Sequence, residues 1–218
     1  RRSSDLFNVN FQTKNPGNHE AFNDINFRRA FSMAMDRQSM VDIAGYGYPT
    51  VNEYPSGLGK AFASWDNPDV EKKYGKYNKF DLEGAKALLK EAGYPNGFES
   101  TLWSAYNNTT SQKVIQFVQQ QLQQVGIKLQ VQALEVGQRA EWVDSWADPK
   151  TAKVRLYYTG WSSSTGEADW ALRPLFSTEA WAPKLNNMSF YSNDVVDGGI
   201  AKALVSTDDN EQAALYKS

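Results

Sequence analysis

Alternation of strand-like and helix-like segments through the middle of the chain most constrains its fold. One amphipathic segment begins at Asp81, a typical N-cap, and ends at Gly93, and a second begins at Thr109 or Thr110 and ends at Gly126. Around them lie short segments typical of strands, one of which alternates apolar and polar residues at a period of two. These strand-like segments are residues 98–104, 127–133 and 154–158. The pattern predicts an α/β fold in which the three strands are neighbours in a mixed sheet flanked by helices.

The flanking segments are less regular. Residues 23–44 place apolar side chains on one face at helical spacing, which predicts a single helix, and residues 138–147 and 210–217 predict two shorter ones. Residues 50–68 have no period and combine Gly, Pro and Asn with aromatic side chains, which is typical of a long loop. Because the last helix is followed by neither a capping Gly nor a return strand, we expect the chain to be a truncated fragment.

Composition excludes several classes of function. The chain has no Cys, so it has no disulfide framework and no thiolate chemistry. Its formal charge is −2, without a long block of like charges, and nothing favours a nucleic acid partner. No apolar run approaches the roughly 20 residues of a membrane span. The first ten residues, RRSSDLFNVN, lack an apolar signal core, so we expect any export signal to lie outside this chain.

The sequence contains no complete catalytic or cofactor motif. Its single histidine, His19, lies in a polar loop without a nucleophile nearby, and no metal- or nucleotide-binding motif is present. We therefore expect no catalytic residue, metal or cofactor. An alternative from another class is a hydrolase that uses Glu167 and Asp169 for acid–base chemistry, although no other residues complete such a site.

The segment RLYYTGWSSSTGEADWAL, residues 155–172, is the strongest candidate for a binding site. A strand runs directly into a Gly-Trp pair and a run of hydroxyl residues, and ligands of open α/β sheets bind at the carboxyl ends of strands. Hydroxyl groups can orient a polar ligand between apolar tryptophan walls. The alternative is a serine-rich surface loop with a buried tryptophan. The candidate residues here are Trp161, Ser162, Ser163, Ser164, Thr165, Asp169 and Trp170.

Two further strand ends supply candidates. Trp103, Ser104, Tyr106 and Asn107 follow the strand of residues 98–104, just before a helix whose free N–H groups attract a carboxylate. Their alternative role is an ordinary strand-to-helix turn. Arg139 follows the next strand and is a candidate for bidentate binding of a ligand carboxylate, or else a solvated helix-surface arginine.

Three stretches resemble the extracytoplasmic solute-binding proteins of family 5, the peptide-binding type. They are FRRAFSMAMDR (27–37), DLEGAKALLKEAGYPNGF (81–98) and QLQQVGIKLQV (121–131). The resemblance implies a type II periplasmic-binding-protein fold with two lobes hinged around a buried ligand. It implies that residues 1–218 form most of the carboxyl-proximal lobe, without the amino-proximal lobe. It also implies a monomeric, periplasmic, non-enzymatic receptor that delivers its ligand to the permease of an ABC importer.

The two halves of the chain resemble different branches of this family. Residues 27–89 are similar to receptors for chito- and cello-oligosaccharides, whereas residues 98–172 are similar to glutathione-binding receptors. Either the chain is a natural mosaic or it joins two sources. The cleft-facing loops lie in the second half, which favours a small peptide, glutathione. The alternative is an oligosaccharide stacked on Tyr54, Trp65 and Trp161.

One position departs from the family pattern. In dipeptide and oligopeptide receptors of this family, an aspartate shortly after the Gly-Trp pair holds the ligand ammonium group. Here Ser164 stands at that position, and Asp169, five residues later, could take over the role. The resemblance therefore implies a ligand shaped differently from a generic dipeptide, and glutathione fits that description.

Overall fold

The computed structural model of the chain describes residues 4–9, 20–46, 51, 67–135, 138, 156–161, 163–165 and 167–218. The strands are β1 (Ser4–Val9), β2 (Phe98–Ser104), β3 (Ile127–Ala133) and β4 (Leu156–Trp161). The α-helices are α1 (Ile25–Met33), α2 (Arg37–Gly45), α3 (Pro68–Tyr74), α4 (Leu82–Glu91), α5 (Thr109–Gln123), α7 (Ala168–Phe176), α8 (Asp194–Val205) and α9 (Asp209–Lys217). Short 3-10 turns are η1 (Glu20–Asn23), η3 (Gly75–Asn78) and η4 (Thr178–Ala180).

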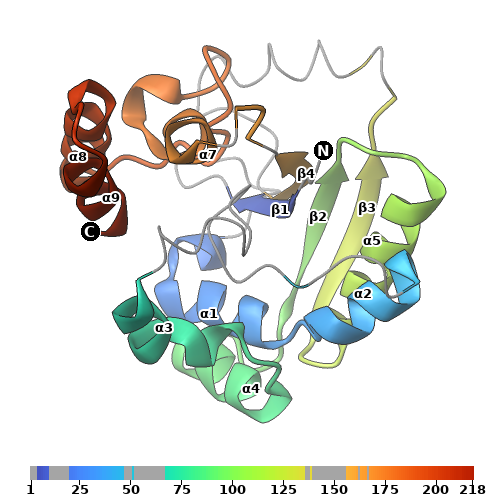
Figure 1. Cartoon of the computed structure of the whole chain (residues 1–218). Coiled ribbons are helices and arrows are strands. Elements are labelled where there is room, and N and C mark those ends of the chain that lie inside the picture. Colours follow the sequence, from blue (N-terminus) through green and yellow to red (C-terminus); the bar gives the residue numbers. More distant parts are fainter. Residues whose placement is uncertain are drawn as a thin grey trace.

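The four described strands form one mixed sheet in the order β1-β4-β2-β3 (Figure 1). Strand β2 pairs in parallel with β3 on one side and with β4 on the other, which confirms that the three predicted strands are neighbours. Strand β1 pairs antiparallel with β4 and was not predicted. Residues 154–155 of the third predicted strand lie outside the described residues.

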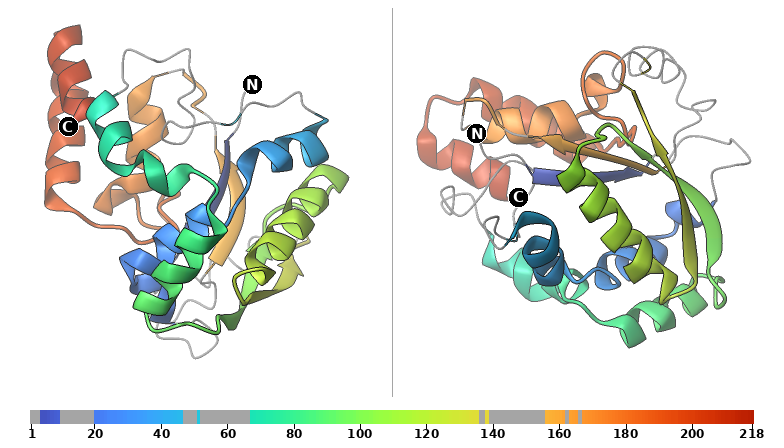
Figure 2. Two further views of the ribbon diagram at one scale, coloured as in Figure 1. Left: turned by 90° about the horizontal axis from the view of Figure 1, so that it is seen from below. Right: turned by 90° about the vertical axis from the view of Figure 1, so that its right-hand side faces the viewer.

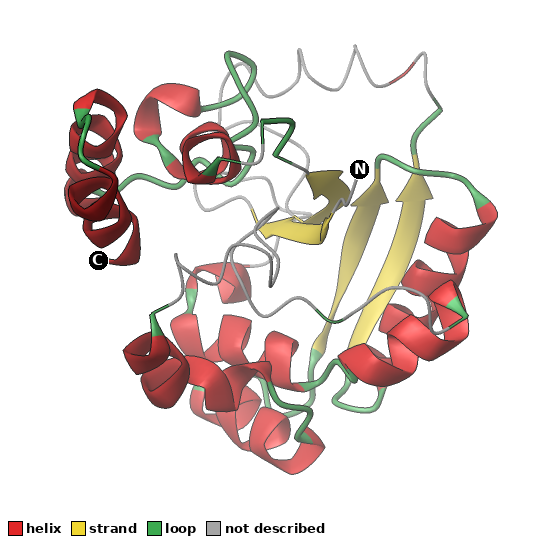
Figure 3. Cartoon of the chain, viewed as in Figure 1, coloured by secondary structure: helices red, strands yellow, loops and turns green. Residues whose placement is uncertain are grey.

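One face of the sheet carries the main hydrophobic core. Leu102, Leu156 and Tyr158 are at most 1% exposed and pack with apolar side chains of α1, α2, α4 and α5. These helices occupy the lower half and right of Figure 3. Val131, predicted on the buried face of β3, is 38% exposed because β3 is the edge strand of the sheet.

The opposite face changes character along the strands. Near the amino ends it is polar and open, with Lys128 and Glu99 forming an exposed ion pair of 3.4 Å. Beside the carboxyl ends of β2 and β3, Tyr157 and Leu134 pack with Ala182 and Phe190 in a second, smaller hydrophobic cluster. The second cluster therefore lies next to the carboxyl ends of β2 and β3.

The predicted helix of residues 23–44 is wrong as a single element, because the chain forms α1 and α2 in its place. Asp36 begins a new helix: its carboxylate accepts from the Ser39 backbone N–H at 3.0 Å and from the Ser39 hydroxyl at 2.6 Å. Arg37 fixes the break, donating to the carbonyl oxygens of Ser32 and Asn78 at 3.0 Å each. Burial lowers the pKa of Arg37, whose charge is compensated by these carbonyl oxygens.

Helices α4, α5 and α9 follow the predictions closely, whereas α3, α7 and α8 were not predicted. Asp81 caps α4, and Gly93 follows its end with φ of 88°, a conformation that favours glycine. Helix α5 begins at Thr109 as predicted, although the cap is Asn108. The predicted helix at 210–217 is α9. Of the predicted helix 138–147 only Gln138 is described, and almost all of the predicted loop 50–68 lies outside the described residues.

Helices α8 and α9 pack together at the end of the molecule farthest from α5, and α7 lies between them and the sheet (Figures 1 and 2). Among the described residues, no helix combines the length and apolar character needed to cross a membrane.

The turn before β2 gives a direct test of the fold. Gly97 has φ of 69°, and a Cβ atom there would overlap the backbone of Gly126, which itself has φ of 85°. We expect Gly97→Ala to lower the free energy of unfolding by at least about 3 kcal/mol, because left-handed strain and overlap add. Gly93→Ala is the matched control: it has a similar φ but nothing within 4 Å. Gly93→Ala should lower the free energy of unfolding by only about 1 to 2 kcal/mol. Equal losses in urea denaturation would refute the close approach.

Candidate functional site

The order of the strands predicts where a ligand would bind. From β2 the chain passes through α5 to β3 on one side, and the next strand, β4, lies on the other side of β2. Such a reversal leaves a crevice at the carboxyl ends of the two diverging strands, where open α/β sheets bind ligands. By this rule we expect the crevice between the ends of β2 and β4, which carry the predicted segments 103–107 and 161–170.

Ser104 and Tyr106 build the turn after β2. The Ser104 hydroxyl is fully buried, donates to the Tyr106 carbonyl at 2.7 Å and accepts from the Tyr106 N–H at 3.1 Å. Its hydroxyl is therefore used to fix the turn, and a direct contact of Ser104 with a ligand stays a prediction.

The Tyr106 side chain holds the ends of β2 and β4 together. Ala105 N–H donates to the Tyr158 carbonyl at 3.0 Å, and then β2 turns away from β4. The Tyr106 phenol oxygen takes the place of the next strand carbonyl and accepts from the Gly160 N–H at 3.2 Å. Its ring meets Tyr158 edge to face, with centroids 6.0 Å apart. Tyr106 thus fixes the position of Gly160 directly before Trp161.

Replacing this phenol isolates its contribution. We expect Tyr106→Phe to keep the ring contact but to lower the free energy of unfolding by about 1 to 2 kcal/mol, because the Gly160 N–H loses its acceptor. Hydrogen exchange at the Gly160 amide measures this bond directly, and it should become faster in the variant. Unchanged exchange at Gly160 would contradict the assigned hydrogen bond.

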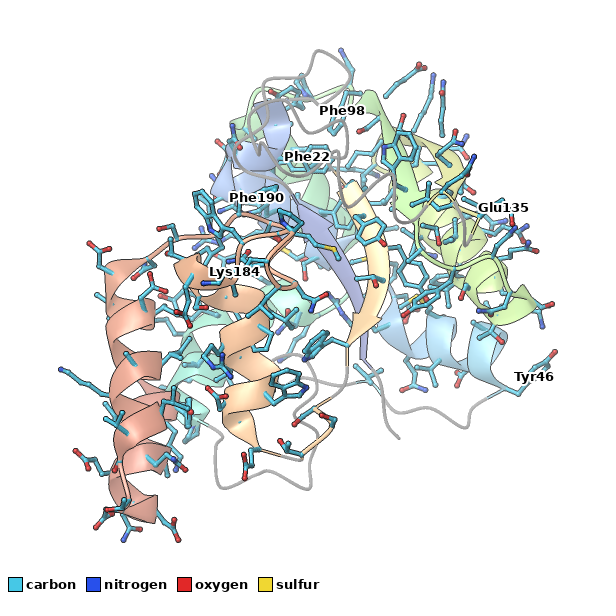
Figure 4. All side chains as sticks on the ribbon, turned by 90° about the horizontal axis from the view of Figure 1, so that it is seen from above. Phe22, Tyr46, Phe98, Glu135, Lys184 and Phe190 are labelled. Carbon is cyan, nitrogen blue, oxygen red and sulfur yellow. The ribbon has the colours of Figure 1, made fainter. Side chains whose placement is uncertain are left out.

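Trp103 and Asn107, at and after the end of β2, contact neighbouring parts of the fold. Trp103 is partly buried against the cluster that contains Phe190, which lies on the α7 and α8 side of β1 and β4 in Figure 4. Asn107 is exposed; its amide donates to Glu135 beyond β3 at 3.4 Å and accepts from Gln112 of α5 at 2.9 Å. Tyr106 therefore contacts β4 directly before Trp161, whereas Asn107 contacts the β3 and α5 side. Arg139 and Ser162 lie outside the described residues.

Two tryptophans form an apolar wall at the end of β4. The Trp161 indole N–H donates to the Trp170 carbonyl at 3.0 Å, and the two rings lie 6.0 Å apart with a tilt of 38°. Both side chains are partly exposed. This contact fixes the start of α7 against β4, so the wall keeps its position without a ligand.

The hydroxyl residues between the tryptophans are mostly engaged with the start of α7. The Ser163 hydroxyl donates to the Glu167 carbonyl at 3.0 Å, and the Glu167 N–H donates to the Thr165 hydroxyl at 3.3 Å. Ser164 and Thr165 are exposed. A hydroxyl oxygen that accepts one bond still has its own proton to donate, so Thr165 can contact a ligand from this position.

Asp169 is held by a residue that the sequence reading missed. Its two carboxylate oxygens accept from Nε and Nη2 of Arg173 at distances of 2.9 to 3.1 Å. The side chains are 17% exposed for Asp169 and 23% for Arg173. Hydrogen bonding to Asp169 raises the pKa of Arg173. An Asp followed four residues later by an Arg on one helix is the signal that could have found the pair.

No group of three or more His, Cys, Asp or Glu side chains that could bind a metal occurs in the part of the chain that the structure describes. The chemical character of the site is that of a binding surface: a fixed aromatic wall, hydroxyl and backbone donors, and one carboxylate–guanidinium pair.

Comparison with known proteins identifies the family. Residues 2–183 match the bacterial extracellular solute-binding proteins, family 5 (Middle). The chain belongs to this family. It is 47% identical over 199 residues to the glutathione-binding protein GsiB of Shigella flexneri serotype 5b, covering 90% of this chain and 37% of that protein. It is also 47% identical to the GsiB of Pectobacterium atrosepticum, covering 90% of this chain and 36% of that one.

Solved structures give the same fold. HbpA2 from Haemophilus parasuis superposes with a TM-score of 0.77 at 25% identity, covering 99% of this chain and 39% of that structure. The periplasmic binding protein DppA from Helicobacter pylori, in complex with the peptide STSA, gives 0.72 at 25% identity, covering 99% and 38%. The chain therefore has an α/β fold of the type II solute-binding class and spans less than half the length of these relatives. Since single relatives cover 90% of the chain, they extend over both halves that resembled different branches.

Proposed function

We propose that this chain is part of a non-enzymatic receptor that captures glutathione outside the cytoplasm and delivers it to the permease of an ABC importer. The observation that carries the proposal is 47% identity, across 90% of the chain, to proteins named as glutathione-binding. The complex of the structural relative DppA with a peptide supports a peptide ligand for this fold.

In this proposal residues 1–218 form most of the carboxyl-proximal lobe of a monomeric, periplasmic receptor with two lobes. The share of the relatives' length, 36% to 37%, supports a second lobe of comparable or greater size. The ligand would lie between the lobes, with the crevice at the ends of β2 and β4 forming one wall.

The chemistry of the site suits glutathione, which carries one ammonium group and two carboxylates. Asp169 offers an anion, Arg173 a cation, and Thr165 a hydroxyl donor within one short segment. Trp161 and Trp170 supply the apolar surface against which a peptide backbone can pack. An oligosaccharide would need open aromatic faces, and the mutual contact of the two tryptophans covers part of theirs.

Tryptophan fluorescence of the full-length receptor that contains this chain tests the proposal, because Trp161 and Trp170 report on the site. Glutathione should produce a saturable change, confirmed by calorimetry, and chitobiose should not. The control is Trp161→Ala, which should reduce the change while leaving the thermal unfolding transition cooperative. Saturable binding of chitobiose without binding of glutathione would replace the peptide ligand with an oligosaccharide.

A further inference from the structure

The Asp169–Arg173 pair leaves hydrogen-bonding capacity on both partners. Arg173 binds Asp169 through Nε and Nη2 only, and among the described residues Asp169 is its one hydrogen-bond acceptor. Since a guanidinium has five N–H groups in a rigid plane, its Nη1 edge remains a second fork for a carboxylate. The Asp169 carboxylate has about four acceptor positions and uses two N–H donors, so an ammonium can still bind.

The surroundings keep this pair oriented and add negative charge, because Glu179 acts electrostatically on Arg173. Both residues lie on α7, at positions four apart, so the helix fixes their separation. The Tyr216 side chain of α9 lies within electrostatic range of both. Burial, and then the negative charge of Asp169, raise the pKa of Tyr216 to about 12, so the phenol is uncharged at neutral pH. A ligand therefore meets one anion and one cation side by side, with the carboxylates of Glu167 and Glu179 near them.

We infer that the Asp169–Arg173 pair recognises an α-amino-acid head group, an ammonium and a carboxylate on the same carbon atom. The inference rests on the proposed function and deepens it. A γ-linked glutamyl peptide such as glutathione carries this head group, because its peptide bond uses the side-chain carboxyl. An α-linked peptide instead presents an ammonium beside an amide. The pair would therefore select γ-glutamyl peptides over α-linked ones.

The selection has a physical reason. Arg173 already neutralises Asp169, so an isolated ammonium is only weakly attracted to the pair. This attraction does not offset the free energy of desolvating the ammonium. A zwitterionic head group can place its ammonium on Asp169 and its carboxylate on the Nη1 edge of Arg173. Each charge then gains a partner in a partly buried site, where truncating one partner of a charge pair is costly.

A ligand series tests this on the unaltered full-length receptor. The probes are glutathione, its α-glutamyl isomer, 4-aminobutyryl-cysteinyl-glycine, which lacks the head-group carboxylate, and glutaryl-cysteinyl-glycine, which lacks the ammonium. Calorimetry should show glutathione binding at least about 30-fold more tightly than each of the three. Binding of the α-isomer or of either truncated probe within about threefold of glutathione overturns the inference while the proposed function stands. Absence of glutathione binding overturns the proposed function itself.

Variants then assign the preference to this arginine. In Arg173→Leu the preference for glutathione over the aminobutyryl probe should fall to about threefold or less. Arg173→Lys keeps a charge but not the fork, and should lose at least about tenfold of the preference; it decides the question if Arg173→Leu does not fold. Lys86→Leu, which removes the exposed partner of Glu83 on α4, is the control and should change nothing. An unchanged preference in a folded Arg173 variant places the carboxylate elsewhere and refutes the inference.

Discussion

The 218-residue chain alone should bind glutathione at least about a hundredfold more weakly than the full-length receptor. In the proposed receptor a second lobe covers the other face of the ligand and excludes water when the lobes close. Without it, the ligand contacts of the crevice between β2 and β4 remain exposed to solvent, where charge pairs such as those offered by Asp169 and Arg173 contribute much less. Calorimetry of the chain and of the full-length receptor, under one buffer condition, measures the difference.

The comparison requires that the isolated chain be folded. Its two hydrophobic clusters and the sheet lie within the described residues, so we expect a cooperative thermal transition by circular dichroism. If the folded chain binds glutathione within about tenfold of the full receptor, one lobe carries nearly all of the affinity and the two-lobe proposal is wrong.

The sequence predicted those elements whose boundaries are set by residues close in the chain, such as glycine turns and helix caps. Strand β2 follows a turn that needs Gly97, and β3 follows Gly126, so the chain marks where each begins. Helix α4 has a cap and a stop within its own sequence, at Asp81 and Gly93. For these segments the predicted and observed bounds agree, because short-range backbone chemistry decides them.

Elements that depend on distant partners were missed. Strand β1 is a strand through its pairing with β4, in which Ser4 opposes Trp161, and nothing in residues 4–9 identifies that partner. The break between α1 and α2 depends partly on Arg37, whose guanidinium reaches the Asn78 carbonyl of η3. A helical periodicity that continues through residue 36 cannot reveal such a contact.

The candidate site shows the same division. The predicted strands β2 and β4 are neighbours, and Tyr106 after β2 reaches Gly160 near the end of β4. What each side chain does there could not be predicted: the Ser104 hydroxyl is used in its own turn, and Tyr106 binds across to Gly160. The Arg173 partner of Asp169 was not predicted because the pair depends on α7, a helix that was itself not predicted.

Replacing Asp169 by Asn in the full-length receptor should weaken glutathione binding by about 2 to 5 kcal/mol. Two losses combine. The ligand ammonium loses its anion, and Arg173, only 23% exposed, loses the carboxylate that holds it in a fixed orientation. An asparagine side chain keeps the size of the aspartate and one acceptor oxygen, so the change removes charge with little effect on packing. Calorimetric titration with glutathione measures the loss, and thermal unfolding reports any separate loss of stability.

Glu83→Gln on α4 is the matched control, since it also removes one partner of an ion pair within a helix. Its pair with Lys86 is exposed, at 85% for Glu83, and should contribute almost nothing to binding or stability. A loss of less than about threefold in Asp169→Asn would place Asp169 outside the ligand contacts. If in the same experiments Trp161→Ala abolishes binding of chitobiose, the ligand is an oligosaccharide stacked on Trp161. A loss within the expected range that is absent in Glu83→Gln places the Asp169–Arg173 pair in the ligand site.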